Sequence, residues 1–160
     1  MWESPILCPL RTINHDWIDY NGHLNMAYYN VLFDQAVDHI YDLLGVGQAY
    51  VRTAQGSCFT MEVHVNYLSE LMLNDSVQVT FQLLDYDEKR LHFFEQMLHA
   101  DTGELAATSE QLALHVDMTS RRSAPFPPLI LEKISDLKSS YANLEVPDIV
   151  VRVIGIRKKA

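Results

Sequence analysis

The chain is poor in basic residues: 12 Lys and Arg stand against 21 Asp and Glu among its 160 residues. The formal net charge is therefore -9, and the isoelectric point lies near 5.1. Nucleic acids and anionic membranes bind to basic protein surfaces, so we expect neither as a main partner. Any anionic ligand must be met by local positive groups.

Cysteine is also scarce, and long apolar runs are missing. Cys8 and Cys58 are the two cysteines, and no secretory signal precedes them, so we expect reduced thiols in a cytoplasmic protein. The longest apolar stretch, around residues 149–156, is interrupted by Arg152 and is too short to span a membrane. Length and a hydrophobic content of 48% predict one domain over residues 1–160, with a C-terminal helix and tail after about residue 128.

Three common catalytic or cofactor motifs are absent as well. There is no Gly-x-Ser-x-Gly, which excludes the usual serine-hydrolase site. Gly45-x-Gly47 lacks a third glycine and follows a helical pattern, so it does not predict dinucleotide binding. No histidine pair has metal-ligand spacing with acid support, and the cysteines are far apart. We therefore expect neither a metal nor a cofactor.

The most informative stretch that is present predicts a long amphipathic helix from about Met26 to Leu44. Asn25 is a favourable N-cap, and Gly45 suits the left-handed position that ends a helix. Apolar residues recur every three to four positions between these ends. The expected buried stripe consists of Tyr28, Leu32, Phe33, Ala36, Val37, Ile40, Tyr41 and Leu44.

An acid and a glycine stand just ahead of this helix. The unpaired N–H groups at a helix start carry partial positive charge, so a carbonyl oxygen that gains negative charge would be stabilised there. Asp19 lies six residues before the N-cap, and Gly22 allows the backbone to double back toward the same point. The alternative is an ordinary turn in which Asp19 and Asn25 serve only as caps.

The motif Asp19-x-x-Gly22-His23-x-Asn25, followed by an aromatic-rich helix, resembles the hotdog-fold acyl-CoA thioesterases of the 4-hydroxybenzoyl-CoA thioesterase type. Further elements resemble the narrower betainyl-CoA thioesterase subgroup of carnitine catabolism, which also occurs fused behind carnitine dehydrogenases. The elements that resemble this subgroup are Glu62-x-His64, Tyr67-Leu68-x-Glu70-Leu71, Lys89-Arg90-Leu91-His92 and Glu110-Gln111-x-x-x-His115-Val116-Asp117. The resemblance as a whole covers roughly residues 5–125.

The strand patterns agree with the fold that this resemblance implies. After an opening strand over residues 7–13 and the long helix, we expect an antiparallel meander and a shorter surface helix over residues 129–141. Alternation in the first meander strand predicts one apolar face. The chain is thus expected to adopt an α+β hotdog fold, an antiparallel sheet of five to six strands wrapped around one long central helix. The meander strands span residues 58–67, 76–84, 90–99 and 105–116.

The resemblance also implies which residues act on the thioester. Asp19 would attack the acyl carbon directly or activate a water molecule as a general base, and the sequence does not choose between these roles. The backbone N–H near Met26 would polarise the thioester oxygen, and His23 would mainly support the turn. The expected catalytic group is Asp19, Gly22, His23, Asn25 and Met26.

Acyl-group and CoA contacts are expected elsewhere in the chain. Aromatic faces and carboxylates hold trimethylammonium groups, and the candidates are Trp17, Tyr28, Glu62, His64 and Tyr67. For Glu62 and His64, exposure to solvent on the polar face of their strand explains their presence about as well as a role in shaping the acyl pocket. The CoA phosphates need cations, for which the candidates are Arg121 and Arg122 first and Lys89 and Arg90 second.

A sheet of this kind leaves exposed edges, so we expect a homodimer or a tetramer of dimers. In the resembled family the site lies at the dimer interface, where Asp19 and its helix from one chain face strands of the other. Two other functions stay open. One is hydrolysis of a medium-chain or aromatic acyl-CoA, and the other is acyl-CoA binding without catalysis.

Overall fold

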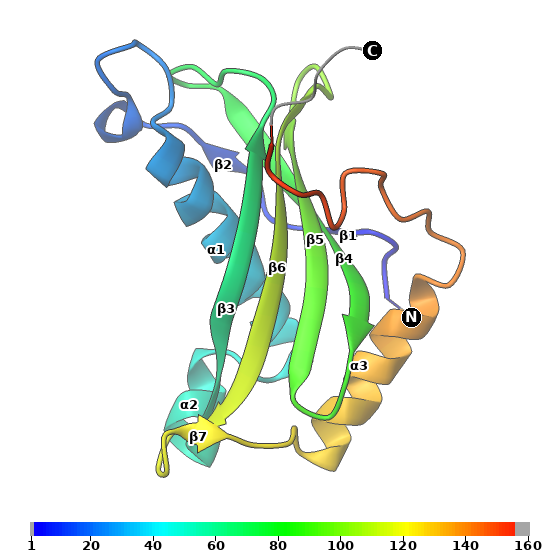
Figure 1. The fold of residues 1–160 in the computed structure, drawn as a ribbon. Coiled ribbons are helices and arrows are strands. Elements are labelled where there is room, and N and C mark those ends of the chain that lie inside the picture. Colours follow the sequence, from blue (N-terminus) through cyan, green and yellow to red (C-terminus); the bar gives the residue numbers. More distant parts are fainter. Residues whose placement is uncertain (1, 156–160) are drawn as a thin grey trace.

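The computed structural model describes residues 2–155, in which an antiparallel sheet curls around one long helix (Figure 1). Helix α1 lies against one face of the sheet, here called the inner face; the opposite face is the outer face. The elements are β1 (Ile6–Leu7), β2 (Arg11–Thr12), the 3-10 helix η1 (His15–Trp17), α1 (Met26–Leu44), α2 (Gln48–Ala54), β3 (Gly56–Tyr67), β4 (Ser76–Tyr86), β5 (Arg90–His99), β6 (Leu105–Asp117), β7 (Arg122–Ser123) and α3 (Pro128–Ser140).

The predicted central helix is confirmed at both ends. The Asn25 side chain accepts a hydrogen bond from the Ala27 N–H, and Gly45 adopts a φ of 87°, in the left-handed region. One residue of the predicted buried stripe is corrected: Tyr28 is half-buried, and its neighbour Tyr29 is buried instead. The other expected stripe residues are buried between α1 and the sheet.

The sheet has seven strands rather than the expected five to six. Its order is β1-β4-β5-β6-β3, with β2 also on β4 and β7 also on β6. The opening strand expected over residues 7–13 is split into β1 and β2, because Pro9 between them has no N–H to continue the ladder. The short strand β7 was not predicted. Strand β3 forms one edge of the sheet, so its free edge pairs with no other strand among residues 2–155.

The prediction that β3 presents one continuous apolar face is wrong. The register shifts between Thr60 and Glu62, where Met61 is the extra residue of a β-bulge. Thr60 pairs with Ala113 and Val63 pairs with Gln111. Thr60 and Val63 therefore both lie on the inner face, although residues three apart in a regular strand would lie on opposite faces. Phe59 consequently lies on the outer face, together with Glu62 and His64.

The C-terminal part adds a helix and a covering segment. Helix α3 agrees with the expected 129–141 within one residue, but it is less superficial than expected, since Ile134 and Leu137 are fully buried. The segment after it lies along the outer face of the sheet (Figure 1), where the Glu145 carbonyl accepts a hydrogen bond from Gln82 at 3.2 Å.

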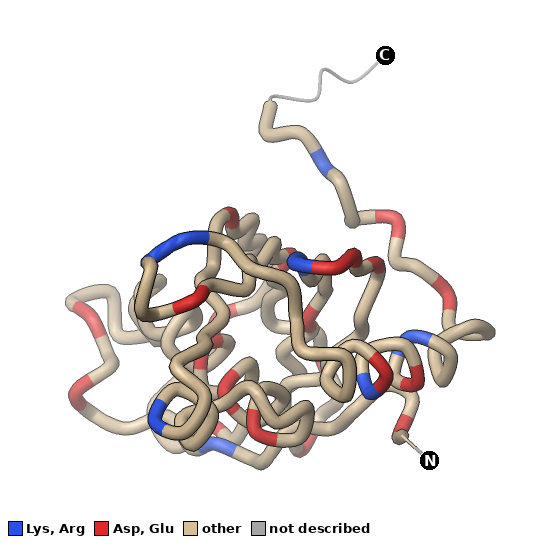
Figure 2. Tube along the Cα trace, turned by 90° about the horizontal axis from the view of Figure 1, so that it is seen from below, with Lys and Arg blue, Asp and Glu red and all other residues tan. Residues whose placement is uncertain are grey.

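Three smaller findings complete the fold. Helix α2 was not predicted, because its seven residues are too few to show a clear period. Within residues 2–155 no helix is both long and apolar enough to cross a membrane. Figure 2 shows Asp and Glu at many places along the tube, whereas Lys and Arg occupy a few short stretches in that view.

Candidate active site

The turn ahead of α1 is closed by its own hydrogen bonds. The Asp19 N–H donates to the His23 carbonyl at 3.0 Å, and the Gly22 N–H donates to the Asp19 carbonyl at 3.0 Å. One oxygen of the Asp19 carboxylate accepts from the Asn21 N–H at 2.8 Å. Gly22 has a φ of 86°, which favours glycine. The motif thus forms a compact hairpin that keeps the half-buried Asp19 beside the chain entering the helix.

The first turn of α1 offers a hydrogen-bond donor at the expected place. Asn25 satisfies the Ala27 N–H at 2.9 Å with its side chain and the Tyr28 N–H at 2.9 Å with its carbonyl. Within residues 2–155 the Met26 N–H donates no hydrogen bond. A free N–H at the positive end of a 19-residue helix is suited to bind a carbonyl oxygen that gains negative charge.

A cavity of about 240 Å³ adjoins this helix start, and we call it the helix-start cavity. Of the predicted residues, His23, Met26 and Tyr67 line it, and Asp19 lies at the other end of the hydrogen-bonded turn. Its complete lining is His23, Leu24, Met26, Tyr29, Tyr67, Leu68, Ser69 and Glu70.

The end of β3 is tied to the start of α1 by Tyr67. Its hydroxyl donates to the Met26 carbonyl at 3.3 Å and accepts from the Asn30 side chain at 3.2 Å. Its ring meets that of Tyr29 edge to face, with centroids 5.2 Å apart. Tyr29 in turn donates to the Ser69 carbonyl at 3.1 Å. These contacts fix the wall of the helix-start cavity.

Trp17 and Tyr28 support the turn from another side. Their rings stack with centroids 5.6 Å apart, and the Trp17 carbonyl accepts from the Asn25 N–H at 2.9 Å. Neither residue lines the helix-start cavity. The structure therefore places Trp17 and Tyr28 next to the Asp19–Asn25 turn, whereas Tyr67, another expected acyl contact, lies in the helix-start cavity.

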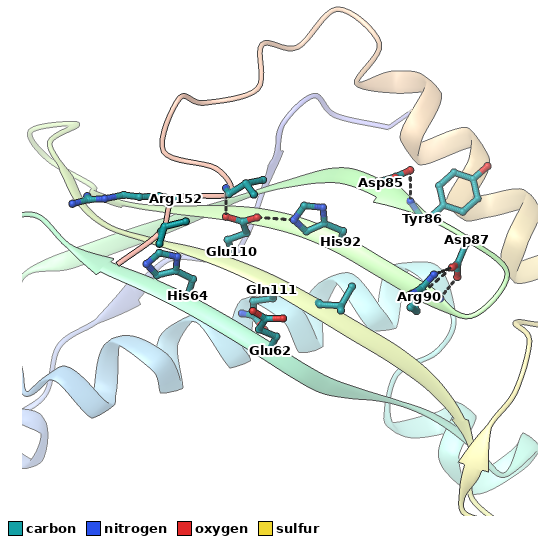
Figure 3. A pocket seen from close by; sticks show the side chains of 13 residues that line it. Glu62, His64, Asp85, Tyr86, Asp87, Arg90, His92, Glu110, Gln111 and Arg152 are labelled. Atoms are coloured by element: carbon teal, nitrogen blue, oxygen red, sulfur yellow. Dashed lines mark hydrogen bonds and ion pairs between the residues drawn. The ribbon is translucent and has the colours of Figure 1, made fainter. Parts of the chain in front are cut away.

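Glu62 and His64 are not brought to the turn within the chain. They line a larger cavity of about 550 Å³ on the outer face, beneath the segment that contains Arg152 (Figure 3). There the Glu110 carboxylate holds His92 at 2.7 Å with one oxygen and the Val151 N–H at 2.7 Å with the other. Glu110 thus anchors the segment that covers this cavity.

The second-choice CoA residues lie beside this outer cavity. Arg90 lines it and pairs with Asp87, with 2.7 Å from its Nε to a carboxylate oxygen. This hydrogen bond from Arg90 lowers the pKa of Asp87. Lys89 lies 3.5 Å from Glu88. Both cations therefore already have carboxylate neighbours.

The first-choice CoA residues lie at the opposite end of β3 from the helix start. Arg122 pairs with Asp117 in the ladder between β7 and β6, and Asp117 also pairs with Gly56, the first residue of β3. The Arg121 guanidinium lies over the Phe59 ring, 5.6 Å from its centroid. One chain therefore does not bring Arg121 and Arg122 to Asp19 (Figure 1).

Tyr29 and Glu70 line the helix-start cavity but were not among the acyl contacts predicted from the sequence. Tyr29 was hidden because Tyr28 fitted the helical stripe better, and Glu70 because it lies in a link where alternation assigns no face. The described residues contain no group of three or more His, Cys, Asp or Glu that could hold a metal ion.

Comparison with characterised proteins places this geometry in context. A betainyl-CoA thioesterase from Pseudomonas aeruginosa is 37% identical over 155 residues, which cover 97% of this chain and 93% of the relative. An L-carnitine dehydrogenase/betainyl-CoA thioesterase from Rhizobium meliloti is also 37% identical, over 94% of this chain, but the chain spans only 31% of that longer protein. The similarity therefore extends beyond the expected limit near residue 125.

Solved structures show the same fold. A hypothetical protein from Staphylococcus aureus, solved in complex with CoA, superposes with a TM-score of 0.90 at 30% identity and covers 98% of both chains. A DHNA-CoA thioesterase from the same organism superposes with a TM-score of 0.74 at 17% identity, over 88% of this chain and 99% of the other. These neighbours confirm the hotdog fold. The model of the thioesterase-like superfamily matches residues 13–134, and this chain belongs to that superfamily.

Proposed function

We propose that this protein hydrolyses the thioester bond of an acyl-CoA, releasing the free acid and CoA. The observation that carries the proposal is the closed turn of Asp19 joined directly to a helix start whose Met26 N–H has no partner within residues 2–155. An acid and an oxyanion donor thus flank one region of space. Family membership and the similarity to named thioesterases support the same reaction.

The reaction uses Asp19 in one of two ways. As a general base, its carboxylate takes a proton from water while the water oxygen bonds to the acyl carbon, and the carbon–sulfur bond then breaks to release the CoA thiolate, which takes up a proton. As a nucleophile, the carboxylate forms an anhydride and expels the thiolate, and water then cleaves the anhydride. In both routes the Met26 N–H stabilises the charge that develops on the carbonyl oxygen.

For the acyl group we propose betainyl, on the strength of the relatives' names. A medium-chain or aromatic acyl group is the alternative. We place the protein in the cytoplasm, where acyl-CoA is available to it.

We further propose that two chains form the site through β3. This edge strand exposes apolar side chains, with Met61 59% and Val63 45% exposed in the single chain. Antiparallel pairing of two β3 edges about a twofold axis sets the start of one strand beside the end of the other. The partner subunit's Arg121 and Arg122 would then approach this chain's helix start, where they can meet the CoA phosphates.

The test is a free-thiol release assay with a panel of acyl-CoAs: betainyl-CoA, short and medium aliphatic acyl-CoAs, and an aromatic acyl-CoA. We expect turnover, with betainyl-CoA giving the highest kcat/KM. Tight binding of acyl-CoA without release of thiol from any of them would instead establish the non-catalytic alternative.

A further inference from the structure

Aromatic and apolar side chains make up most of the lining of the helix-start cavity, which has a volume of about 240 Å³. Two aromatic rings, Tyr29 and Tyr67, meet at an interplanar angle of 81° and form a corner. Met26, Leu24 and Leu68 add apolar surface. Such a corner suits a compact group with an apolar outer surface.

The cavity also carries a negative charge. Its lining contains one carboxylate, that of Glu70, and no Lys or Arg. Glu70 lies 3.9 Å from the His23 Nε2, while the His23 Nδ1 lies 3.1 Å from the Leu24 carbonyl. Burial raises the pKa of Tyr29, and the negative charge of Glu70 raises it further, so the field of this carboxylate reaches the ring.

The position of the cavity limits what it can bind. Met26 both lines the cavity and supplies the free N–H at the helix start. A group held here therefore lies close to the carbonyl that this N–H would bind. In a betainyl thioester one methylene separates the carbonyl carbon from the trimethylammonium nitrogen, so the cation must adjoin the reacting carbon.

We propose that the helix-start cavity binds the quaternary ammonium group of a short cationic acyl chain, with Tyr29 and Tyr67 as the aromatic walls and Glu70 as the counter-charge. This inference rests on the proposed thioester hydrolysis and names its specificity residues. It replaces Glu62, the counter-charge expected from the sequence, because Glu62 lies on the outer face of the sheet.

The test compares betainyl-CoA with tert-butylacetyl-CoA, in which carbon replaces the quaternary nitrogen, so that shape is kept and charge is lost. Glu70→Gln should lower kcat/KM for betainyl-CoA about five- to tenfold, a modest loss because the Glu70 side chain is 74% exposed. The value for tert-butylacetyl-CoA should change less than about twofold. Glu132→Gln, an exposed change on α3, serves as the matched control and should alter neither substrate.

A second pair of variants separates the ring from its hydroxyl. Tyr67→Phe keeps the aromatic wall and should keep the preference for the cation, although it loses the hydrogen bond to Met26. Tyr67→Leu should lose most of that preference. Equal losses for both substrates in Glu70→Gln would overturn the inference, and so would a charge-selective loss in Glu62→Gln instead.

A binding measurement separates this inference from the proposed hydrolysis. Calorimetry with the Asp19→Asn protein should show tighter binding of betainyl-CoA than of tert-butylacetyl-CoA, and adding Glu70→Gln should remove the difference. If the wild-type protein hydrolyses neither compound but this binding difference is seen, the hydrolysis proposal fails and the cation site stands. If binding shows no dependence on Glu70, the cation site is refuted whatever the rates are.

Discussion

Gly22 determines the backbone conformation of the Asp19–Asn25 turn. Its φ of 86° is unfavourable for residues with a side chain, yet a Cβ added there would meet no atom within 4 Å. Gly22→Ala should therefore cost about 1 kcal/mol through backbone strain alone. Because the strained backbone carries Asp19, we also expect kcat/KM to fall, measured by thiol release alongside thermal unfolding.

Gly103→Ala provides the matched control for this prediction. Gly103 also has a positive φ, 72°, and open space around it, but it lies in the turn between β5 and β6. Both variants should lose similar stability, and only Gly22→Ala should lose activity. The same activity loss in both would mean that Gly22 matters for folding and not for the site.

Glu95 is a second residue with a specific consequence, here for stability against pH. It is fully buried, and while one carboxyl oxygen accepts from Gln111 at 2.9 Å, the other has no partner among the described residues. Burial raises its pKa well above the ordinary value of 4.5. In the folded protein Glu95 therefore keeps its proton at pH values where the unfolded chain has lost it.

The sign of the effect follows from this difference. As the pH rises above about 4.5, ionisation favours the unfolded chain, so stability falls until the pH passes the raised pKa of the folded state. Glu95→Gln should remove this contribution and flatten the melting temperature against pH relative to wild type. The exposed Glu132→Gln should keep the wild-type slope, and an unchanged slope in Glu95→Gln would contradict a protonated Glu95.

At the scale of elements, local signals decide what the sequence can predict. Both ends of α1 were predicted correctly because single residues mark them. Asn25 accepts a hydrogen bond from an N–H group at the start of the helix, and Gly45 adopts the left-handed conformation at its end. The bulge at Met61 could not be predicted from the sequence, because the apolar residues on either side of it alternate as they would in a regular strand. The inner and outer faces of β3 are set by pairing with β6, which is a long-range contact.

The same reasoning explains the candidate site. The Asp19–Asn25 turn is local, so its residues were identified from spacing. The joining of Tyr67 to the helix start depends on how β3 ends against α1. Glu70 acquires its place from that contact as well, so its motif, although recognised in the sequence, did not predict a position in the cavity.

Strand β3 also carries a prediction as an element. Val63 is 45% exposed in the single chain, and we propose that pairing with a second copy buries it. Val63→Lys should produce a monomer in size-exclusion chromatography with light scattering, because a charge at a paired edge opposes association. Turnover should fall with it, since the partner's Arg121 and Arg122 would leave the site.

Val153→Lys is the control for this change, because Val153 is 86% exposed on the segment after α3. It should leave the assembly unchanged. A fully active Val63→Lys monomer would remove the shared site from the account and leave the turn and the helix-start cavity to act within one chain.

At the scale of the whole molecule, two cavities lie on opposite sides of one sheet. The larger, outer cavity is covered by the segment that Glu110 anchors. Of its two arginines, Arg90 is paired with the Asp87 carboxylate, and Arg152 donates a hydrogen bond to the Asn66 side-chain carbonyl. The smaller cavity is lined by His23 of the Asp19–Asn25 turn, by Met26 at the helix start and by the Glu70 carboxylate. We propose the smaller cavity as the acyl site because of the residues that line it, although the outer cavity is larger.

The most direct test of the account is the rate of thiol release from betainyl-CoA by Asp19→Asn, compared with wild type. The change keeps a side-chain oxygen that can accept from the Asn21 N–H, so the circular dichroism spectrum and melting temperature should stay near wild type. We expect nearly all turnover to be lost, whereas Asp16→Asn, at an exposed neighbouring carboxylate, should keep it. A wild-type rate in Asp19→Asn would show that the thioester is cleaved elsewhere.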